Sequence, residues 1–221
     1  MSYQIHWFKK NLRFQDNEIL LKRNNSSSIL IYIIEPELWL QKDMSQRQWE
    51  FIWESVKLLK TDLAKHKLHL NILSGDASEI FHSLHQKYSF TEVISEQETG
   101  IHWTFERDKK LKSFFQDLKI KWVEYPYFGV KRGKHNRDHW AGSIQQILKK
   151  PLINIEKYID KREIVNFDEH EKPINFYDKT PCPFRQKGGS NQAHDLWETF
   201  LESRGENYPR ERSSPITSEH R

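Results

Sequence analysis

The sequence predicts an α/β fold: a Rossmann-like five-stranded parallel sheet flanked by helices, followed by an extended linker and a C-terminal helix. Short apolar runs of strand length alternate with segments in which apolar residues recur every three or four positions, so strands and helices alternate. This alternation implies right-handed crossovers between parallel strands. The simplest strand order is 3-2-1-4-5, in which the direction of winding switches between the first and fourth strands.

Five apolar runs predict the strands of this sheet. The second run is almost unbroken, which is typical of a parallel strand covered on both faces. The five runs lie at residues 3–8, 28–34, 67–73, 92–95 and 120–125.

The segments between these strands predict helices. After the first strand, Asp16 and Asn17 indicate a turn and the N-cap of a short helix, because their short side chains accept hydrogen bonds from free backbone amides. Residues 45–66 carry one apolar stripe over several helical turns. Asp76 is expected to cap the next helix. In the helix at 103–118, apolar residues share one side, and most charged residues, Arg107 and Asp108 included, are expected elsewhere.

Beyond the fifth strand the pattern changes. Residues 126–133 form a basic loop punctuated by glycine, and residues 137–149 predict a short helix with an inward apolar side. Prolines, charges and the lack of a period over residues 151–189 predict an extended linker. Residues 191–204 predict a last helix, with Gly205 as a left-handed C-terminal cap. We expect no following segment to cover its wide apolar face.

Composition limits the class of protein. Hydrophobic residues make up 36% of the 221 residues and charged residues 30%, so the chain has little apolar material for a second core. The net charge of +4 supports only mild attraction to anions. A single cysteine, Cys182, excludes an internal disulfide framework and fits a reducing compartment. Since the sequence shows neither a signal peptide nor a membrane-spanning run, we expect a cytoplasmic protein that does not enter a membrane.

Several kinds of site are not supported by the sequence. The histidines do not cluster with cysteines or carboxylates at the spacing of metal ligands, so no metal site is predicted. Both a glycine-rich phosphate loop and a serine nucleophile elbow are absent, and no catalytic residue is assigned.

A candidate ligand site lies where the strand order switches, because ligands bind there, outside the carboxyl ends of parallel strands. A basic loop follows the first strand, and a carboxylate-rich segment follows the fourth, so the two should face each other. A planar heteroaromatic ligand needs apolar walls and a few donors and acceptors. The candidate residues are Phe8, Lys10, Arg13, Gln97 and Glu98, with Trp7 and Trp39 as further walls.

A purely structural role for the same groups stays open. Arg13 and Glu98 would then form ion pairs at the sheet edge, with Asp16 as a further partner. The densest basic run has two interpretations as well: contact with phosphates, or a solvated positive face. Its members are Lys131, Arg132, Lys134, His135 and Arg137.

Residues 7–13, WFKKNLR, with Asp16 and Asn17 after them, resemble the opening of the DNA photolyase and cryptochrome family. There, Trp-Phe-Arg-Arg-Asp-Leu-Arg leads to Asp-Asn and a small helix. The resemblance covers about residues 2–130. Further matching positions are Tyr32 to Pro36, the helix from Arg47 to Leu59, Gly75, Asp76, Arg107 and Asp108.

A second set of matches looks like the connector and first helix of one bacterial branch of this family. It comprises Gly129 to Arg132, Asn136 to Trp140, Gly188, Gly189, Phe200, Leu201, Arg204, Gly205, Tyr208 and Ser213 to Pro215. The opening loop also departs from the family. Lys9, Lys10 and Asn11 stand in place of Arg, Arg and Asp, which puts the usual loop ion pair of that aspartate in question.

The resemblance implies an antenna domain that holds a folate, deazaflavin or flavin and harvests light for a second, all-helical domain. That second domain binds FAD and damaged DNA, for repair or for blue-light sensing. The chain ends at Arg221, where the family's FAD-clamping segment would begin, so we expect the helical domain to be missing and the chain to be inactive alone. Tyr208 matches a family position that touches FAD.

The expected domains follow from this resemblance. Residues 1–130 form the α/β domain, residues 131–189 a basic connector and irregular linker, and residues 190–221 the first helix and start of the FAD-binding domain. Two alternatives stay open. One is a stand-alone nucleotide- or flavin-binding module. The other is an interaction fragment whose 191–204 helix self-associates or docks onto a separate FAD-binding domain.

Overall fold

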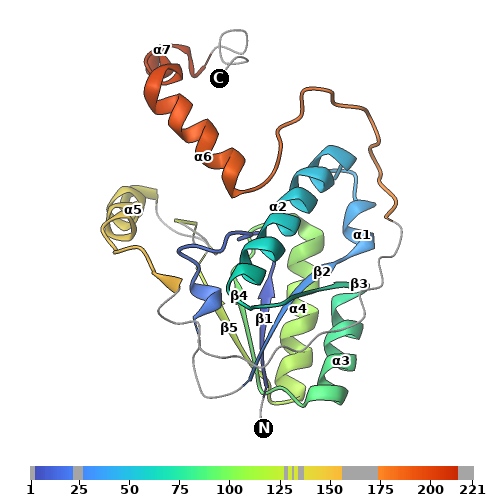
Figure 1. Cartoon of the computed structure of the whole chain (residues 1–221). Helices are drawn as coiled ribbons and strands as arrows, with labels where there is room; N and C mark the ends of the chain where they lie inside the picture. The colour runs from blue at the N-terminus through green and yellow to red at the C-terminus, as the bar shows by residue number, and fades with distance from the viewer. Residues whose placement is uncertain are drawn as a thin grey trace.

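The computed structural model describes residues 3–21, 27–126, 129–130, 132–133, 137–155 and 174–213. Five strands form one sheet in the order β3-β2-β1-β4-β5, and each neighbouring pair is parallel (Figure 1). The strands are β1 (Tyr3–Phe8), β2 (Ser27–Ile34), β3 (Leu70–Ser74), β4 (Glu92–Glu96) and β5 (Lys121–Tyr125). The predicted fold class and strand order are confirmed.

The helices follow the predicted periods in the first half of the chain. Up to β5 they are η1 (Glu18–Leu20), α1 (Pro36–Trp39), α2 (Gln46–Lys65), α3 (Ala77–Tyr88) and α4 (His102–Asp117). After β5 come η2 (Arg137–His139), α5 (Trp140–Leu148), α6 (Ser190–Thr199), the π-helical turn η4 (Phe200–Arg204) and α7 (Tyr208–Glu211). No helix in these described ranges is long and apolar enough to cross a bilayer.

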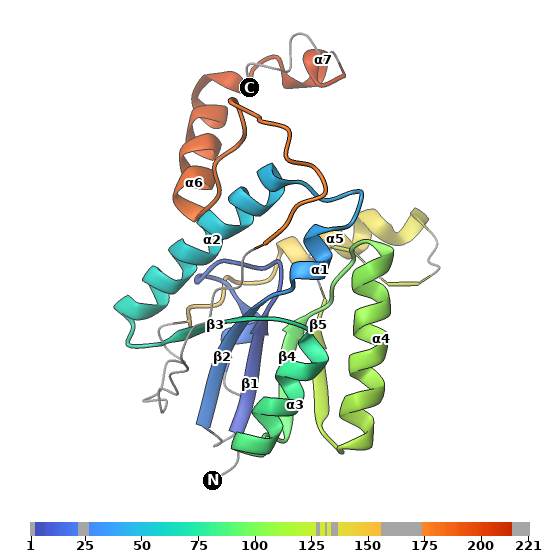
Figure 2. The ribbon, with the colours of Figure 1, turned by 90° about the vertical axis from the view of Figure 1, so that its right-hand side faces the viewer.

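A separate apolar core covers each face of the sheet. On one face α2 packs through Val56, Leu59 and Leu63. On the other, α3 and α4 lie side by side and pack through residues that include Phe81 and Phe115 (Figure 2). Because the central strands are buried on both sides, they read as continuous apolar runs in the sequence.

The predicted helix starts in this half are confirmed. The Asn17 side chain accepts a hydrogen bond of 3.1 Å from the Ile19 amide, and Asp16 makes the turn before it with φ 50°. Asp76 accepts a bond of 2.8 Å from the Ser78 amide at the start of α3. The third strand starts later than residue 67, because Lys67 has φ 59° and belongs to the turn that ends α2.

The predictions for the second half need correction. The apolar residues of α5 do not point into a core: Trp140 is 57% exposed and Leu148 66%. No residue of α6 is buried either, so its apolar residues are not inward. Gly205 is not a left-handed cap, because it has φ −80° and its amide bonds to the Phe200 carbonyl at 2.8 Å, closing the π-helical turn.

Candidate functional site

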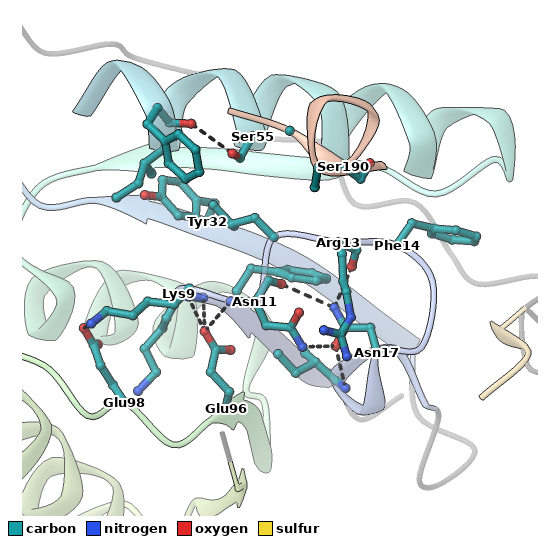
Figure 3. Close-up of a pocket in the computed structure, with 18 of the residues that line it drawn as sticks. Lys9, Asn11, Arg13, Phe14, Asn17, Tyr32, Ser55, Glu96, Glu98 and Ser190 are labelled. Atoms are coloured by element: carbon teal, nitrogen blue, oxygen red, sulfur yellow. Dashed lines mark hydrogen bonds and ion pairs between the residues drawn. The ribbon is translucent and has the colours of Figure 1, made fainter. Parts of the chain in front are cut away.

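A cleft of 2310 Å³ opens at the carboxyl ends of the strands, at the predicted switch between β1 and β4. The structure brings all five candidate residues of the α/β domain to its lining: Phe8, Lys10, Arg13, Gln97 and Glu98. Further lining comes from α2, from residues 147–153 and from the first turn of α6, as Figure 3 shows in part. The remaining candidate, Tyr208, lies in α7 and packs edge-on against Phe200 at 5.5 Å between ring centroids.

The candidate side chains differ in how far they are free to meet a ligand. Arg13 and Lys10 are exposed, with 50% and 44% of their side chains accessible. Lys10 Nζ lies 3.5 Å from Glu98 Oε1. Arg13 pairs with Asp16 at 3.3 Å, as expected if these groups have a purely structural role. Glu98 is not part of this ion pair and binds Lys10 and Arg107. Phe8 is fully buried and belongs to the core beneath the cleft.

The loop after β1 is held by one buried carboxyl group, that of Glu96. Its Oε1 accepts hydrogen bonds from the backbone amides of Lys9 and Asn11, both at 3.0 Å, and from that of Lys10 (Figure 3). Burial raises the pKa of Glu96, although the charge of Lys9 and the backbone bonds oppose this shift. Three adjacent amides on one oxygen fix the path of the loop that carries Lys10 and Arg13.

Arg107 on α4 gathers three carboxylates below the cleft. It donates hydrogen bonds to Glu35 and Glu98, and its Nη2 lies 2.9 Å from Asp108 Oδ1. The guanidinium also lies over the ring of Trp7, 5.0 Å from its centroid. Burial alone would lower the pKa of Arg107, but the surrounding carboxylates raise it, so this cation stays charged.

Two of the three carboxylates bound by Arg107, Glu35 and Glu98, have opposite pKa shifts. Burial raises the pKa of Glu35 from 4.5 to about 7, and Arg107 only partly offsets it. Burial also acts on Glu98, but Arg107, Lys9 and Lys10 outweigh it and lower the pKa of Glu98. Near neutral pH, the Glu98 carboxylate is therefore an anionic hydrogen-bond acceptor, whereas the Glu35 carboxyl group is partly protonated.

Two more cations complete the network: Lys9, which follows β1, and Arg132, which follows β5. Lys9 Nζ lies 3.3 Å from Asp108 Oδ2 and 4.6 Å from the centre of the Trp7 ring. Arg132 pairs with Asp108 at 3.1 Å and with Glu124 at 2.8 Å.

The basic run therefore contributes to the structure at Arg132, because its guanidinium is already paired with the carboxylates of Asp108 and Glu124. Three other members of the run, Lys131, Lys134 and His135, lie outside the described residues. The side chain of Arg137 lies outside them as well. Contact of the whole run with phosphates and a solvated positive face both stay predictions.

Sequence reasoning missed the charged groups that organise the cleft, chiefly Glu35, Glu96, Arg107 and Asp108. Contrary to the prediction, Arg107 and Asp108 lie on the buried face of α4. A signal for Glu35 and Glu96 exists in the sequence, since each stands at the carboxyl end of an apolar strand, where a parallel sheet places its site. Arg107 and Asp108 share the helical face of Leu111, and an apolar stripe interrupted by charge is a mark of buried pairing.

A comparison with known families matches the DNA photolyase model to residues 4–126, more than half of the chain. The chain belongs to the DNA photolyase family. Curated relatives include Cryptochrome-2 of Gallus gallus, 27% identical over 97 residues that cover 43% of this chain and 17% of the relative. Cryptochrome-1 of Gallus gallus is 24% identical over 119 residues, which cover 53% of this chain and 19% of the relative.

Solved structures of photolyases and cryptochromes share the fold. The archaeal photolyase of Sulfolobus tokodaii aligns with TM-score 0.62 at 18% identity, over 88% of this chain and 46% of that one. The cryptochrome of Synechocystis sp. PCC6803 aligns with TM-score 0.67 at 14% identity, over 96% of this chain and 48% of that one. This photolyase-family chain thus spans about half the length of these two relatives.

Proposed function

We propose that the cleft binds an antenna chromophore, namely a folate, deazaflavin or flavin, within a photolyase/cryptochrome-like flavoprotein. The observation that carries the proposal is the convergence of Lys10, Arg13, Gln97 and Glu98 on one opening at the strand switch, with the buried ring of Phe8 beneath it. The Sulfolobus tokodaii photolyase holds two FAD molecules, which implied a novel light-harvesting cofactor in that protein. This likeness supports a pigment as the ligand here.

The residues present fit a planar, polar-edged ring system. The aromatic side chains of Tyr32 and Trp39 line the cleft and supply apolar surface. Arg13 and Lys10 offer exposed donors, and Glu98 offers a charged acceptor held in place by Arg107. A bound pigment would supply absorption of near-ultraviolet or blue light. The protein's part is to bind the ring, orient it and keep Glu98 ionised.

The activity of a complete protein is part of the same proposal. Light harvested at the cleft would serve a helical domain that binds FAD, contacts DNA and repairs pyrimidine dimers or senses blue light, in the cytoplasm. Tyr208 would contact FAD only with that helical domain present. We expect the 221-residue chain alone to lack deoxyribodipyrimidine photolyase activity. Dimer repair by the purified chain under blue light would refute that expectation.

A second candidate function is that of an interaction fragment, and the exposure of the last helices favours it. Trp197 is 58% exposed and Leu201 64%. Large apolar side chains on neighbouring turns are typical of a surface that another protein covers. Such a fragment would self-associate or dock onto a separate FAD-binding domain.

Absorbance of the purified protein from the near ultraviolet to the blue tests the chromophore proposal. A pigment band should accompany the protein, either as purified or after incubation with a folate, a deazaflavin and a flavin in turn, and should persist through gel filtration. Arg13→Gln should weaken retention, whereas Arg210→Gln, an exposed substitution on α7, should not. If the protein retains none of the three pigments, the cleft is not an antenna site. A stand-alone nucleotide-binding module is favoured instead if an adenine nucleotide copurifies.

A further inference from the structure

Residues 174–189, which we call the strap, run from the end of α1 along α2 to the start of α6 (Figures 1 and 2). The strap joins the α/β domain at the beginning of α2. The Tyr177 amide donates to the Trp39 carbonyl at 3.1 Å, and the Gln46 amide donates to the Asp178 carbonyl at 2.9 Å. Gln46 is the first residue of α2, whose amide has no partner within its own helix. The strap therefore supplies the acceptor for an otherwise free backbone amide at the start of α2.

Arg185 fastens the strap further along α2. Its guanidinium lies 2.5 Å from Glu50 Oε2 and 2.5 Å from Glu54 Oε1, two carboxylates one helical turn apart. The hydrogen bonds from Arg185 lower the pKa of Glu54 to about 2, so this carboxylate stays ionised at any ordinary pH. Because the Arg185 guanidinium bridges two carboxylates, it fixes the orientation of the strap relative to α2 as well as the distance between them.

Two glycines bring the strap backbone against α2. The Gly188 amide donates to Glu54 Oε2 at 2.8 Å. A Cβ at Gly188 would lie 1.9 Å from the Phe51 carbonyl oxygen, and one at Gly189, which has φ 105°, would lie 2.9 Å from Leu58 Cδ2. Only glycine permits this approach. We call Arg185, Gly188 and Gly189, with Glu50 and Glu54, the latch.

The latch is followed at once by a wall of the cleft. α6 begins at Ser190, and residues of its first turn and a half line the cleft: Ser190, Asn191, Ala193 and His194. Figure 3 shows Ser190 across the opening from the loop that carries Arg13 and Phe14. The position of this wall relative to the α/β domain is thus set by contacts of the strap with α2.

We propose that Arg185, Gly188 and Gly189 are positioning residues that hold the start of α6 as the second wall of the cleft. The first wall is the β1 loop held by Glu96. The ligand site then extends beyond residues 4–126, the part that matches the family model. The position of this wall can be measured without any ligand. Only its effect on pigment binding rests on the proposed function.

The position of the wall is measured without a ligand. Spin labels on cysteines at Gln15 and Asn191, both exposed, report the width of the cleft in a Cys182→Ser background. The distance distribution should be narrow in this background and broad with Arg185→Gln or Gly188→Ala added. Lys187→Gln, which removes an exposed positive charge from the same strap, should leave it narrow. Distributions that stay the same in both latch variants would overturn the proposal.

A pigment titration then tests what the wall does. With riboflavin or a folate as the probe, Arg185→Gln should weaken affinity about tenfold, and Lys187→Gln should not. An unchanged affinity in a variant whose distances have broadened would show that α6 is not part of the site. If the wild-type protein binds no pigment, the proposed function fails, and the distance measurement by itself decides whether the latch sets the wall.

Discussion

Arg107 donates a hydrogen bond to Glu35, although the two residues are 72 positions apart, and both side chains are at least nine-tenths buried. Arg107 belongs to α4, which follows β4, and Glu35 follows β2. Because β2 and β4 are the two neighbours of β1 in the sheet, the pair joins the segments that follow these strands. With Glu98 as a second acceptor, it forms the floor of the cleft. These charged groups thus pack together at the end of the sheet where the cleft opens.

Removing the guanidinium should destabilise the protein strongly. Arg107→Met removes the cation that pairs with Glu35, Glu98 and Asp108, and the loss of one partner of a buried pair costs about 3–5 kcal/mol. Urea unfolding at neutral pH measures the change. Lys109→Gln, an exposed change on the same helix, should lie within about 0.5 kcal/mol of wild type. Equal stabilities for the two variants would contradict a buried network.

The raised pKa of Glu35 predicts a specific pH dependence. The folded protein holds the proton up to about pH 7, whereas the unfolded chain releases it near 4.5. The folded state therefore binds more protons between these values, so Glu35 stabilises the fold below 4.5 and this contribution is lost as pH rises through 7. Its upper limit is about 3 kcal/mol. The stability difference between wild type and Glu35→Gln should fall across this interval, and a difference that is constant or rises with pH would contradict the assignment.

Two substitutions at Glu96 should separate hydrogen bonding from charge. Glu96→Gln keeps an acceptor oxygen for the amides of Lys9, Lys10 and Asn11, so we expect little loss of stability. Glu96→Met removes the acceptor and leaves one buried amide, that of Lys9, and two partly buried amides unsatisfied, at up to about 1–3 kcal/mol for each. Hydrogen exchange at these three amides should accelerate only in the Met variant. Slow exchange in that variant would show that the loop is held by other contacts.

The exposed apolar residues of α6 and η4 predict association. If Trp197 and Leu201 form a contact surface, sedimentation velocity should show a concentration-dependent increase in size for wild type. The double variant Trp197→Glu, Leu201→Glu should remain monomeric. A wild-type protein that is monomeric at every concentration tested would exclude self-association and leave docking onto a different chain as the remaining form of this hypothesis.

The sequence predicts the sheet well because each central strand is a continuous apolar run and each connecting helix has one apolar stripe. The simplest strand order with right-handed crossovers is the one observed, and the location of the cleft followed from that order. Glu35 and Arg107 could not be paired in this way, since no periodic pattern links positions 72 apart.

The second half of the chain was harder to predict for a different reason. An amphipathic pattern at 140–148 or 191–204 predicts a helix but does not say what its apolar side packs against. In the structure, Trp140 and Trp197 remain exposed. The latch was also missed, because Arg185 and two glycines in a proline-rich segment look like any loop until α2 is placed beside them.

An NMR titration of the labelled protein with a flavin, a deazaflavin and a folate tests most directly whether the cleft binds a pigment. Saturable shifts at the amides of Lys10, Gln97 and Glu98, with smaller ones at the start of α6, are the predicted result for at least one pigment. Shifts confined to residues 196–213, or no saturable shift with any of the three, would contradict a pigment cleft at the strand switch.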